Sequence, residues 1–217
     1  AASDVYKRQS QCPVVIGPNR IQAAKYLMEN TDSNVILSDD GLQHFSLGRD
    51  IEILMIDGNR KFGNELLLPA GPLREPKSRI KTVDFTISSN RKWPSVAKYE
   101  MKYRPFKWVH MKSQKEYDIF DWPLKKEVNA VAGIGNPSNF FNLLKQLGFE
   151  ISEYAFPDHH DFHSVDFEIM DNQPTVMTEK DAIKCSFLDH TNYWYLKIEA
   201  EVSDNFEQDF LAEIKSK

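Results

Sequence analysis

The feature that most constrains the fold is an apolar run that stops at two carboxylates. Residues 34–44 read NVILSDDGLQH, so the apolar residues 35–37 are soon followed by Asp39, Asp40 and Gly41. Such a run predicts a buried strand, and in open parallel α/β sheets ligands bind just beyond the carboxyl ends of the strands. Carboxylates placed there can hold a Mg²⁺ ion that bridges nucleotide phosphates. A simple Asp-Asp-Gly turn closing a strand would give the same pattern, so both interpretations stay open.

The remaining sequence predicts an α/β fold built on mostly parallel sheets. Short apolar runs alternate with helical stretches, and strands separated by crossovers favour a parallel sheet covered by helices. Between residues 93 and 122 apolar and polar side chains alternate, which predicts half-solvated antiparallel strands. We interpret this stretch as a β-ribbon that joins two lobes. The expected strands lie at 14–16, 35–37, 51–57, 83–87, 175–177 and 194–196 and from 128 onward, and the expected helices at 20–30, 140–147 and 204–214.

The overall composition disfavours several classes of protein. A net charge of −5 and a pI near 5.7 argue against a nucleic-acid partner, which would require a basic domain. Cys12 and Cys185 lie far apart and outside any CxxC motif, so neither a zinc site nor a disulfide framework is predicted, and a reducing cytoplasm is favoured. No window approaches the roughly 18 apolar residues that a transmembrane helix needs.

A long loop between two expected strands carries further charged candidates. Residues 62–76 read FGNELLLPAGPLREP, with two glycines and three prolines. Long ordered loops of this kind are often functional. Arg74 could pair with phosphate oxygens through its planar guanidinium, and Glu75 could reach a metal ion. A solvated Arg/Glu pair beside a rigid turn is the alternative.

A second loop concentrates histidines between aspartates. Residues 156–163 read FPDHHDFH and hold three of the six histidines. A histidine oriented by Asp158 could act as a general base or as a partner for developing charge. A purely structural loop and a metal site remain alternatives, although the HExxH spacing of helical zinc sites is absent.

The segment TEKD at 178–181 is typical of a helix start, with Thr178 as N-cap and Asp181 near the positive end of the helix. A second role is open for Lys180 or Asp181 near a bound nucleotide, because this helix start would lie at the carboxyl end of a strand. The segment GIG at 133–135 lacks the third glycine of a dinucleotide fingerprint and indicates only a tight turn. The chain also lacks a GxxxxGK[ST] phosphate loop, so either the nucleotide interpretation fails or the chain is incomplete.

Five motifs together resemble one family. In chain order they are SDDGLQH (38–44), LLPAGPLREP (67–76), AGIGNP (132–137), FPDHH (156–160) and MTEKDA (177–182). They closely resemble the tetraacyldisaccharide 4'-kinases, the lipid A 4'-kinases of Gram-negative bacteria, over roughly residues 12–202. The resemblance implies a P-loop kinase-like fold of two α/β lobes joined by a two-stranded linker. It also implies ATP- and Mg²⁺-dependent phosphorylation of the 4'-hydroxyl of an acylated glucosamine disaccharide 1-phosphate. The expected location is the cytoplasmic face of the bacterial inner membrane, with peripheral membrane contact.

The resemblance also implies roles for individual residues. Asp39 and Asp40 match Walker B-like carboxylates that act in catalysis and at the metal, and Glu75 matches an additional carboxylate on the metal side. His159 matches an active-site histidine that helps an upstream aspartate to activate the hydroxyl. The residues expected to bind substrate or phosphate are Arg74, His44, Asp158 and His160, and Lys180 and Asp181 are expected at the nucleotide cofactor.

The expected domain organisation follows from the same resemblance. Residues 1–9 show no regular period and are interpreted as a non-native leader. Residues 10–92 would form the C-terminal part of the nucleotide-binding lobe, 93–122 the β-ribbon linker, and 123–217 a second α/β lobe. The family's membrane-associating helix, phosphate loop and upstream catalytic aspartate would precede residue 12, so the sequence is interpreted as N-terminally truncated and is expected to lack kinase activity by itself.

Two other functions remain open at the level of sequence. One is a metal-dependent hydrolase that uses Asp39 and Asp40 with the histidines at 159, 160 and 163, and it predicts tight binding of a transition metal without nucleotide. The other is a non-catalytic nucleotide-binding protein, which predicts ATP binding without phosphate transfer.

Overall fold

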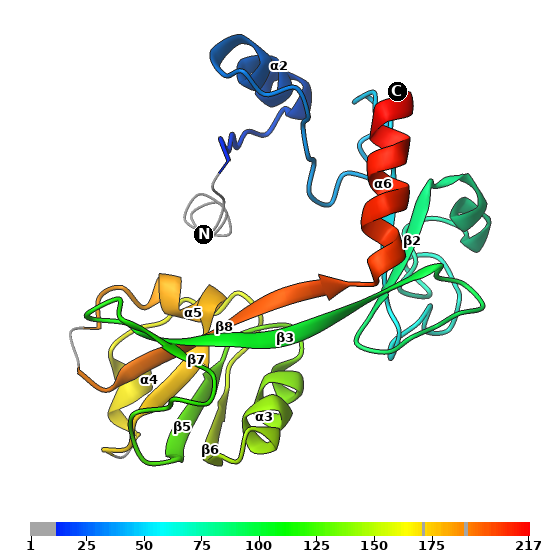
Figure 1. The fold of residues 1–217 in the computed structure, drawn as a ribbon. Coiled ribbons are helices and arrows are strands. Elements are labelled where there is room, and N and C mark those ends of the chain that lie inside the picture. Colours follow the sequence, from blue (N-terminus) through cyan, green and yellow to red (C-terminus); the bar gives the residue numbers. More distant parts are fainter. Residues whose placement is uncertain (1–11, 171, 189–190) are drawn as a thin grey trace. The chain divides into compact units, whose positions relative to one another are not determined.

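The computed structural model describes residues 12–170, 172–188 and 191–217, so the leader expected at 1–9 lies outside the described residues. These residues form two compact units (Figure 1). We call Pro105–Glu199 the His159 unit, and Cys12–Arg104 together with Ala200–Lys217 the Asp40 unit. Within the described residues, no helix is long and apolar enough to cross a membrane.

The His159 unit is a helix-covered, mostly parallel sheet. Strand β5 lies between β6 and β7, and β8 pairs with the other side of β7, all in parallel. The short strand β4 pairs antiparallel with the end of β3. The strands are β3 (Tyr99–His110), β4 (Glu116–Asp118), β5 (Glu127–Ala132), β6 (Glu150–Ala155), β7 (Thr175–Thr178) and β8 (Tyr193–Val202), and the helices are α3 (Pro137–Gln146), α4 (Val165–Glu168) and α5 (Glu179–Lys184).

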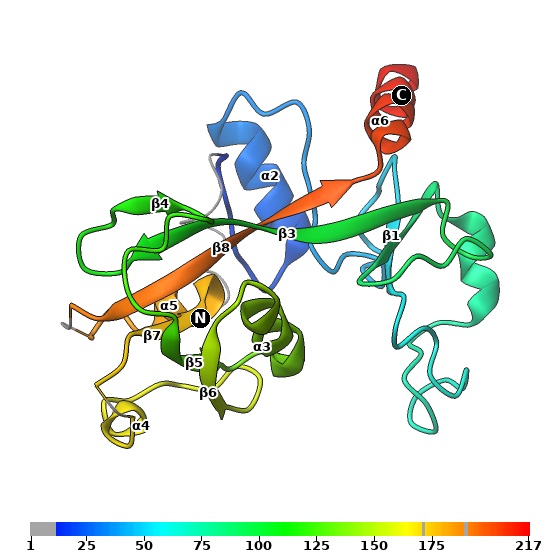
Figure 2. The same cartoon turned by 60° about the horizontal axis from the view of Figure 1, so that its bottom comes forward.

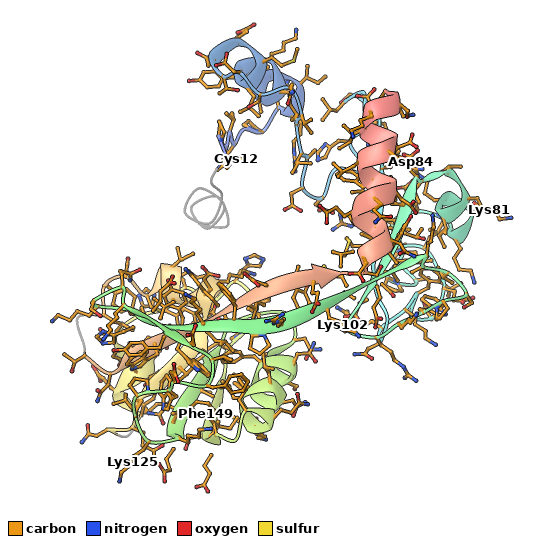
Figure 3. The ribbon with its side chains drawn as sticks, viewed as in Figure 1. Cys12, Lys81, Asp84, Lys102, Lys125 and Phe149 are labelled. Carbon is orange, nitrogen blue, oxygen red and sulfur yellow. The ribbon has the colours of Figure 1, made fainter. Side chains whose placement is uncertain are left out.

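Strand β5 shows why this sheet is buried on both faces. Its alternate residues Val128, Ala130 and Ala132 join a core with α3, whereas Val131 joins a different core. Successive side chains of a strand point to opposite faces, so a continuous apolar run buries both. Figure 3 labels Phe149 in the first of these cores, just before β6.

The Asp40 unit contains a smaller parallel sheet in the order β1-β2-β3. Helix α6 packs Phe206 and Phe210 against Phe85 of β2 and Tyr99 of β3, where the rings form edge-to-face contacts. Its elements are α2 (Arg20–Asn30), β1 (Ile53–Asp57), the 3₁₀-helix η1 (Lys77–Thr82), β2 (Phe85–Ser89), the start of β3 and α6 (Asp204–Ser216).

Two strands run from one unit into the other. The unit boundaries fall after Arg104, within β3, and after Glu199, within β8. The two strands are neighbours in the sheet; they run side by side in Figure 1 and cross in the view of Figure 2. Strand β3 lies inside the ribbon expected at 93–122, but β8 lies outside it. The expected lobe 123–217 also differs from the structure, because α6 packs on β2 and β3 in the Asp40 unit.

The α/β class and most expected elements are confirmed, but two expected strands are wrong. The helix at 20–30 is present with the predicted bounds, and Asn19 caps it by accepting from two backbone N–H groups. Residues 14–16 and 35–37 are irregular, and Leu37 is 83% exposed. A strand needs a neighbour to pair its backbone groups, and among the described residues no strand pairs with either segment. The apolar residues at 14–16 and 35–37 therefore do not form the predicted strands.

Candidate active site

Asp40 lies in a tight turn that side chains hold in place. The residue has a left-handed backbone with φ 48°, a conformation that costs energy for most residues but is tolerated by Asp. Gly41 packs closely on Ser38, since a Cβ at position 41 would lie 2.8 Å from the Ser38 hydroxyl oxygen and would force Ser38 to shift. Arg20 donates to the Asp39 carbonyl at 2.8 Å, and Arg49 donates to the Gly41 carbonyl at 2.8 Å. Two guanidinium groups thus fix the turn from outside.

Arg74 reaches this turn from the long loop. Its Nη1 donates to Asp40 Oδ2 at 3.1 Å and is 3.4 Å from the side-chain oxygen of Gln43. Asp40 and Arg74 are both well exposed. Arg74 and Asp40, which the sequence places in the same candidate site, are therefore in contact. Arg74 and Glu75 do not pair with each other, as the alternative interpretation would require. Arg74 pairs with Asp40, and Glu75 pairs with Arg79.

Glu75 belongs to a network of charges beneath the turn. Its carboxylate accepts from Gln43 Nε2 at 2.7 Å and from Arg79 Nε at 3.1 Å. Arg79 also pairs with Glu52, which pairs with Arg49 at 2.6 Å. The Arg79 hydrogen bond holds the pKa of Glu52 below its usual value, although partial burial opposes this effect. Both oxygens of Glu75 are thus already engaged by donors.

The metal set expected from the sequence is not assembled. Within the part of the chain that the structure describes, no group of three or more His, Cys, Asp or Glu side chains is placed to hold a metal ion. The carboxylate oxygens of Asp40 and Glu75, which could bind a metal ion, instead accept hydrogen bonds from Arg74, Gln43 and Arg79. His44, also expected here, donates its backbone N–H to the Gly41 carbonyl and is partly buried.

The other candidates meet at one edge of the His159 unit. Strands β5, β6 and β7 are parallel, so the segments that follow them lie at the same edge of the sheet. After β6 come Asp158, His159 and His160, and after β7 come Lys180 and Asp181. The topology therefore places five predicted site residues at one sheet edge.

Asp158 connects two of these segments. It accepts from Lys180 Nζ at 3.2 Å and from the His159 backbone N–H at 3.0 Å. Partial burial would raise the pKa of Asp158, but the hydrogen bond and the charge of Lys180 outweigh it and hold the pKa below its usual value. His159 is exposed, has φ 62° and places Nε2 at 3.8 Å from Asp158 Oδ2. An exposed imidazole beside an ionised carboxylate can accept or share a proton.

His160 points into the protein instead. Its ring stacks on Phe156 at 4.7 Å, and its Nε2 is 3.0 Å from Asp166 Oδ2. Asp166 also accepts from the His163 backbone N–H, and this bond contributes most to holding the Asp166 pKa below its usual value. His159 and His160 thus face different partners, and the described part of the chain gathers no three His, Cys, Asp or Glu side chains that could hold a metal ion. This removes the geometric basis for the predicted histidine contribution to a metal-dependent hydrolase.

Asp181 is fully buried and acts as a brace. Its Oδ2 accepts from the Gly133 backbone N–H at 2.9 Å and from the Thr178 hydroxyl at 2.6 Å, and its Oδ1 is 3.4 Å from Lys184 Nζ. Thr178 is the N-cap of α5, as predicted. In this conformation Asp181 offers no open oxygen to a ligand. Of the two residues expected to contact the nucleotide, only Lys180 is accessible.

Sequence reasoning missed the groups that support these sites. Gln43 bridges Arg74 and Glu75, although it stands inside the SDDGLQH motif. Arg79 was signalled only by its position four residues after Glu75, a common spacing for an ion pair. Lys184 donates to the His160 carbonyl at 3.3 Å, and no local pattern indicated that contact.

Parallel α/β sheets with charged side chains beyond the carboxyl ends of strands are typical of the nucleotide-binding α/β class. The chain matches the family model for tetraacyldisaccharide-1-P 4'-kinase, LpxK, over residues 5–215. The chain belongs to this family.

Similar proteins support the assignment. A tetraacyldisaccharide 4'-kinase of Legionella pneumophila strain Corby is 46% identical over 205 residues, which cover 94% of this chain and 61% of the relative. The tetraacyldisaccharide 4'-kinase of Nitrosococcus oceani is 45% identical over 203 residues, which cover 92% of this chain and 58% of that protein. A crystal structure of LpxK from Aquifex aeolicus, described as an "apo" form in complex with ATP, matches with a TM-score of 0.70 at 26% identity, covering 89% of this chain and 61% of that one. The kinase-like fold class expected from the sequence is thus confirmed, and the chain spans about three fifths of the length of these relatives.

Proposed function

We propose that this chain contributes to an ATP-dependent kinase that phosphorylates the 4'-hydroxyl of a tetraacyldisaccharide 1-phosphate. The observation that carries the proposal is the 46% identity over 205 residues to a protein named for that activity. The ATP complex of the Aquifex aeolicus relative supports ATP as the phosphate donor.

In this proposal Arg74 and Asp40 lie where the negative charge of the transferred phosphoryl group must be neutralised. Phosphoryl transfer depends mainly on positioning and on stabilising negative charge. The guanidinium of Arg74 has the planar shape that phosphate oxygens fit, and the pair is exposed, so a phosphate can compete for it without unfolding the turn. Exchange of Asp40 for phosphate on Arg74 would free the carboxylate.

The donor chemistry of this turn fits Mg²⁺. Magnesium prefers oxygen ligands and usually takes only one or two carboxylates together with phosphate oxygens, so a cage of three protein donors is not required. Asp39 and Asp40 are the residues that would hold it, whereas Glu75 is bound to Gln43 and Arg79 and would act through them. The ion would supply positive charge at the transferred phosphoryl group.

His159 and its neighbours would serve the acceptor hydroxyl. The exposed imidazole can take or share the hydroxyl proton, while Asp158 orients the loop through the His159 backbone N–H. Lys180 is held at Asp158 and adds positive charge at the same sheet edge.

We also propose that the enzyme works at the cytoplasmic face of the inner membrane through peripheral contact, because its acylated substrate resides in a bilayer.

The test is an assay of the whole product of the gene. Purified protein is incubated with ATP labelled in the γ-phosphate and tetraacyldisaccharide 1-phosphate in detergent micelles, and NMR locates the added phosphate. We expect transfer to the 4'-position. His159→Ala should lower kcat by about a hundredfold, within the usual range for losing an acid–base group.

His163→Ala is the matched control, since His163 lies in the same loop and its hydrogen bond to Asp166 comes from the backbone N–H, which the substitution keeps. Its kcat should stay within about threefold of the wild type. No labelled product, or equal losses in both variants, would contradict the proposal.

A further inference from the structure

A shallow groove in the Asp40 unit has an aromatic floor. The rings of Phe62 and Trp93 lie 4.8 Å apart, and the open space above them measures about 590 Å³. Both rings are partly exposed. The groove, which we call the Phe62–Trp93 groove, is lined by Phe62, Glu65, Lys77, Ser78, Ile80, Lys81, Trp93, Ser95 and Val96.

Cations surround this floor. Lys61 lies over the Trp93 ring, with Nζ 5.2 Å from its centroid, and Lys77 lies over the Phe62 ring at 5.8 Å. Glu65 neutralises Lys77 through a 2.7 Å ion pair. Lys81 is exposed and, among the described residues, has no acidic side chain within ion-pair distance; Figure 3 shows it projecting outward from η1. The rim thus keeps positive charge that the protein itself does not neutralise.

This positive charge is unusual for the chain. Residues 58–98 hold nine Lys and Arg against three Asp and Glu, although the whole chain has a net charge of −5. Three of the nine, Arg74, Arg79 and Lys98, pair with acidic residues outside this stretch, and the other six are Lys61, Lys77 and Lys81 at the groove together with Arg60, Arg91 and Lys92. Lys61, Lys77 and Lys81, gathered around two partly exposed aromatic rings, give this part of an acidic protein local complementarity to an anionic surface.

The loop that adjoins the groove exposes three consecutive leucines. Leu66, Leu67 and Leu68 directly follow Glu65 and are 52%, 47% and 62% exposed. Backbone hydrogen bonds to Leu73 hold them in a fixed turn, with Leu68 N–H donating to the Leu73 carbonyl and Leu73 N–H to the Leu66 carbonyl. Isolated exposed leucines are common, but three in succession on an ordered loop form an apolar patch that calls for a partner.

We propose that the Phe62–Trp93 groove and the leucines at 66–68 form a docking surface for an anionic phospholipid bilayer. Lysines would meet the phosphate headgroups, tryptophan favours the boundary between headgroups and acyl chains, and leucines enter the apolar layer. The inference rests on the proposed function in one respect, since an enzyme for an acylated substrate must reach it at a bilayer. Binding itself requires no catalysis.

Vesicle sedimentation with the whole gene product tests whether the positive charge of Lys81 contributes to binding. Vesicles contain either phosphatidylcholine alone or phosphatidylcholine with 30% phosphatidylglycerol. Lys81→Glu should weaken partition onto the anionic vesicles about tenfold, because each basic residue near such a surface contributes roughly a fivefold gain and reversal also adds repulsion. Lys125→Glu, an equal change of net charge at an exposed site of the other unit, should stay within about twofold (Figure 3). The difference should shrink in high salt because ions screen the attraction.

Tryptophan fluorescence tests the groove directly. Anionic vesicles should shift the emission of the wild type to shorter wavelength, and Trp93→Phe should abolish most of that shift while keeping a ring beside Phe62. Trp108 and Trp194 are 0% and 4% exposed, so they respond little to a bilayer. Trp122 is partly exposed but belongs to the His159 unit, so the signal that remains in Trp93→Phe measures its share of the shift. Circular dichroism confirms that each variant is folded.

The outcomes separate this inference from the proposed function. Selective loss of anionic binding in Lys81→Glu and loss of the vesicle-induced fluorescence shift in Trp93→Phe, with kinase activity retained in detergent micelles, support the docking surface. Equal binding by Lys81→Glu, Lys125→Glu and wild type would overturn it even if kinase activity is found. Stronger competition by free glycerol phosphate or an oligonucleotide than by vesicles would also overturn it, since either would identify a soluble anion or a nucleic acid as the partner.

Discussion

The two units position their candidate residues by different means. In the His159 unit, Asp158 lies three residues after the end of β6 and Lys180 two residues after the end of β7, and the parallel ladder of these strands brings the two side chains together. In the Asp40 unit, Asp40 follows an irregular segment, and contacts from Arg20, Arg49 and Arg74 define the turn. A backbone ladder is cooperative, whereas exposed ion pairs each contribute little. The Asp40 turn should therefore yield more easily to change than the sheet edge that carries His159.

The largest expected effect contrasts the interiors of the two units. Leu144 on α3 is fully buried, whereas Leu37 before the Asp40 turn is 83% exposed. Leu144→Ala should lower the free energy of unfolding by about 3–5 kcal/mol through lost burial and a cavity. Leu37→Ala should change it by less than about 0.5 kcal/mol. Chemical denaturation followed by circular dichroism measures both, and similar losses in the two variants would show that the segment at 35–37 is packed after all.

A smaller effect is expected from the buried brace of the sheet edge. Asp181→Asn keeps the shape but offers one acceptor oxygen instead of two to Gly133, Thr178 and Lys184. We expect a loss of about 2 kcal/mol, the scale of an unsatisfied buried polar group. Asp161→Asn, at an exposed carboxylate of the same unit, serves as the control and should be near neutral. Unchanged thermal stability in Asp181→Asn would refute the brace.

The smallest effect concerns the charge network of the Asp40 unit and depends on pH. Because Arg79 holds the pKa of Glu52 below its value of 4.5 in an unfolded chain, the ionised form stabilises the fold above about pH 4.5. This stabilisation disappears as the pH falls through the lowered pKa of the folded state. Glu52→Gln should cost about 1 kcal/mol at pH 7, and progressively less as the pH falls below 4.5.

Glu29→Gln on α2 is the control for Glu52→Gln, since Glu29 is exposed. Urea unfolding at several pH values compares the two variants. A difference between Glu52→Gln and wild type that grows toward low pH would have the wrong sign and would exclude the proposed network.

The sequence predicted the fold well where local pattern and long-range pairing agree. The apolar run from Val128 becomes a strand because β6 and β7 pair with both of its edges. The run at 35–37 has the same local character but lacks such partners among the described residues. Helix α6 was predicted with nearly correct bounds, yet its docking on Phe85 could not be foreseen, since amphipathic pattern gives a buried face without naming the neighbour.

In the candidate site too, local motifs predicted some features, whereas others depend on long-range contacts. Motifs identified the charged residues, and parallel topology explains why Asp158 and Lys180 meet. The pairing of Arg74 with Asp40 spans 34 positions and was not specified by either motif. The buried state of Asp181 was also missed, because the signature of a helix cap is the same for an exposed and a buried carboxylate.

The central claim is that the Asp40 turn is part of the phosphoryl-transfer site, and two Asp-Gly turns in one unit allow a matched test. Asp57-Gly58 ends β1 and uses its carboxylate for the local N–H groups of Asn59 and Arg60, whereas Asp40-Gly41 presents its carboxylate to Arg74. The measurement is kcat for transfer from ATP to tetraacyldisaccharide 1-phosphate by the whole gene product and its Asp40→Asn and Asp57→Asn variants. We expect Asp40→Asn to lower kcat by about a hundredfold or more, and folded Asp57→Asn to retain it within about threefold. Wild-type kcat in Asp40→Asn would contradict the account.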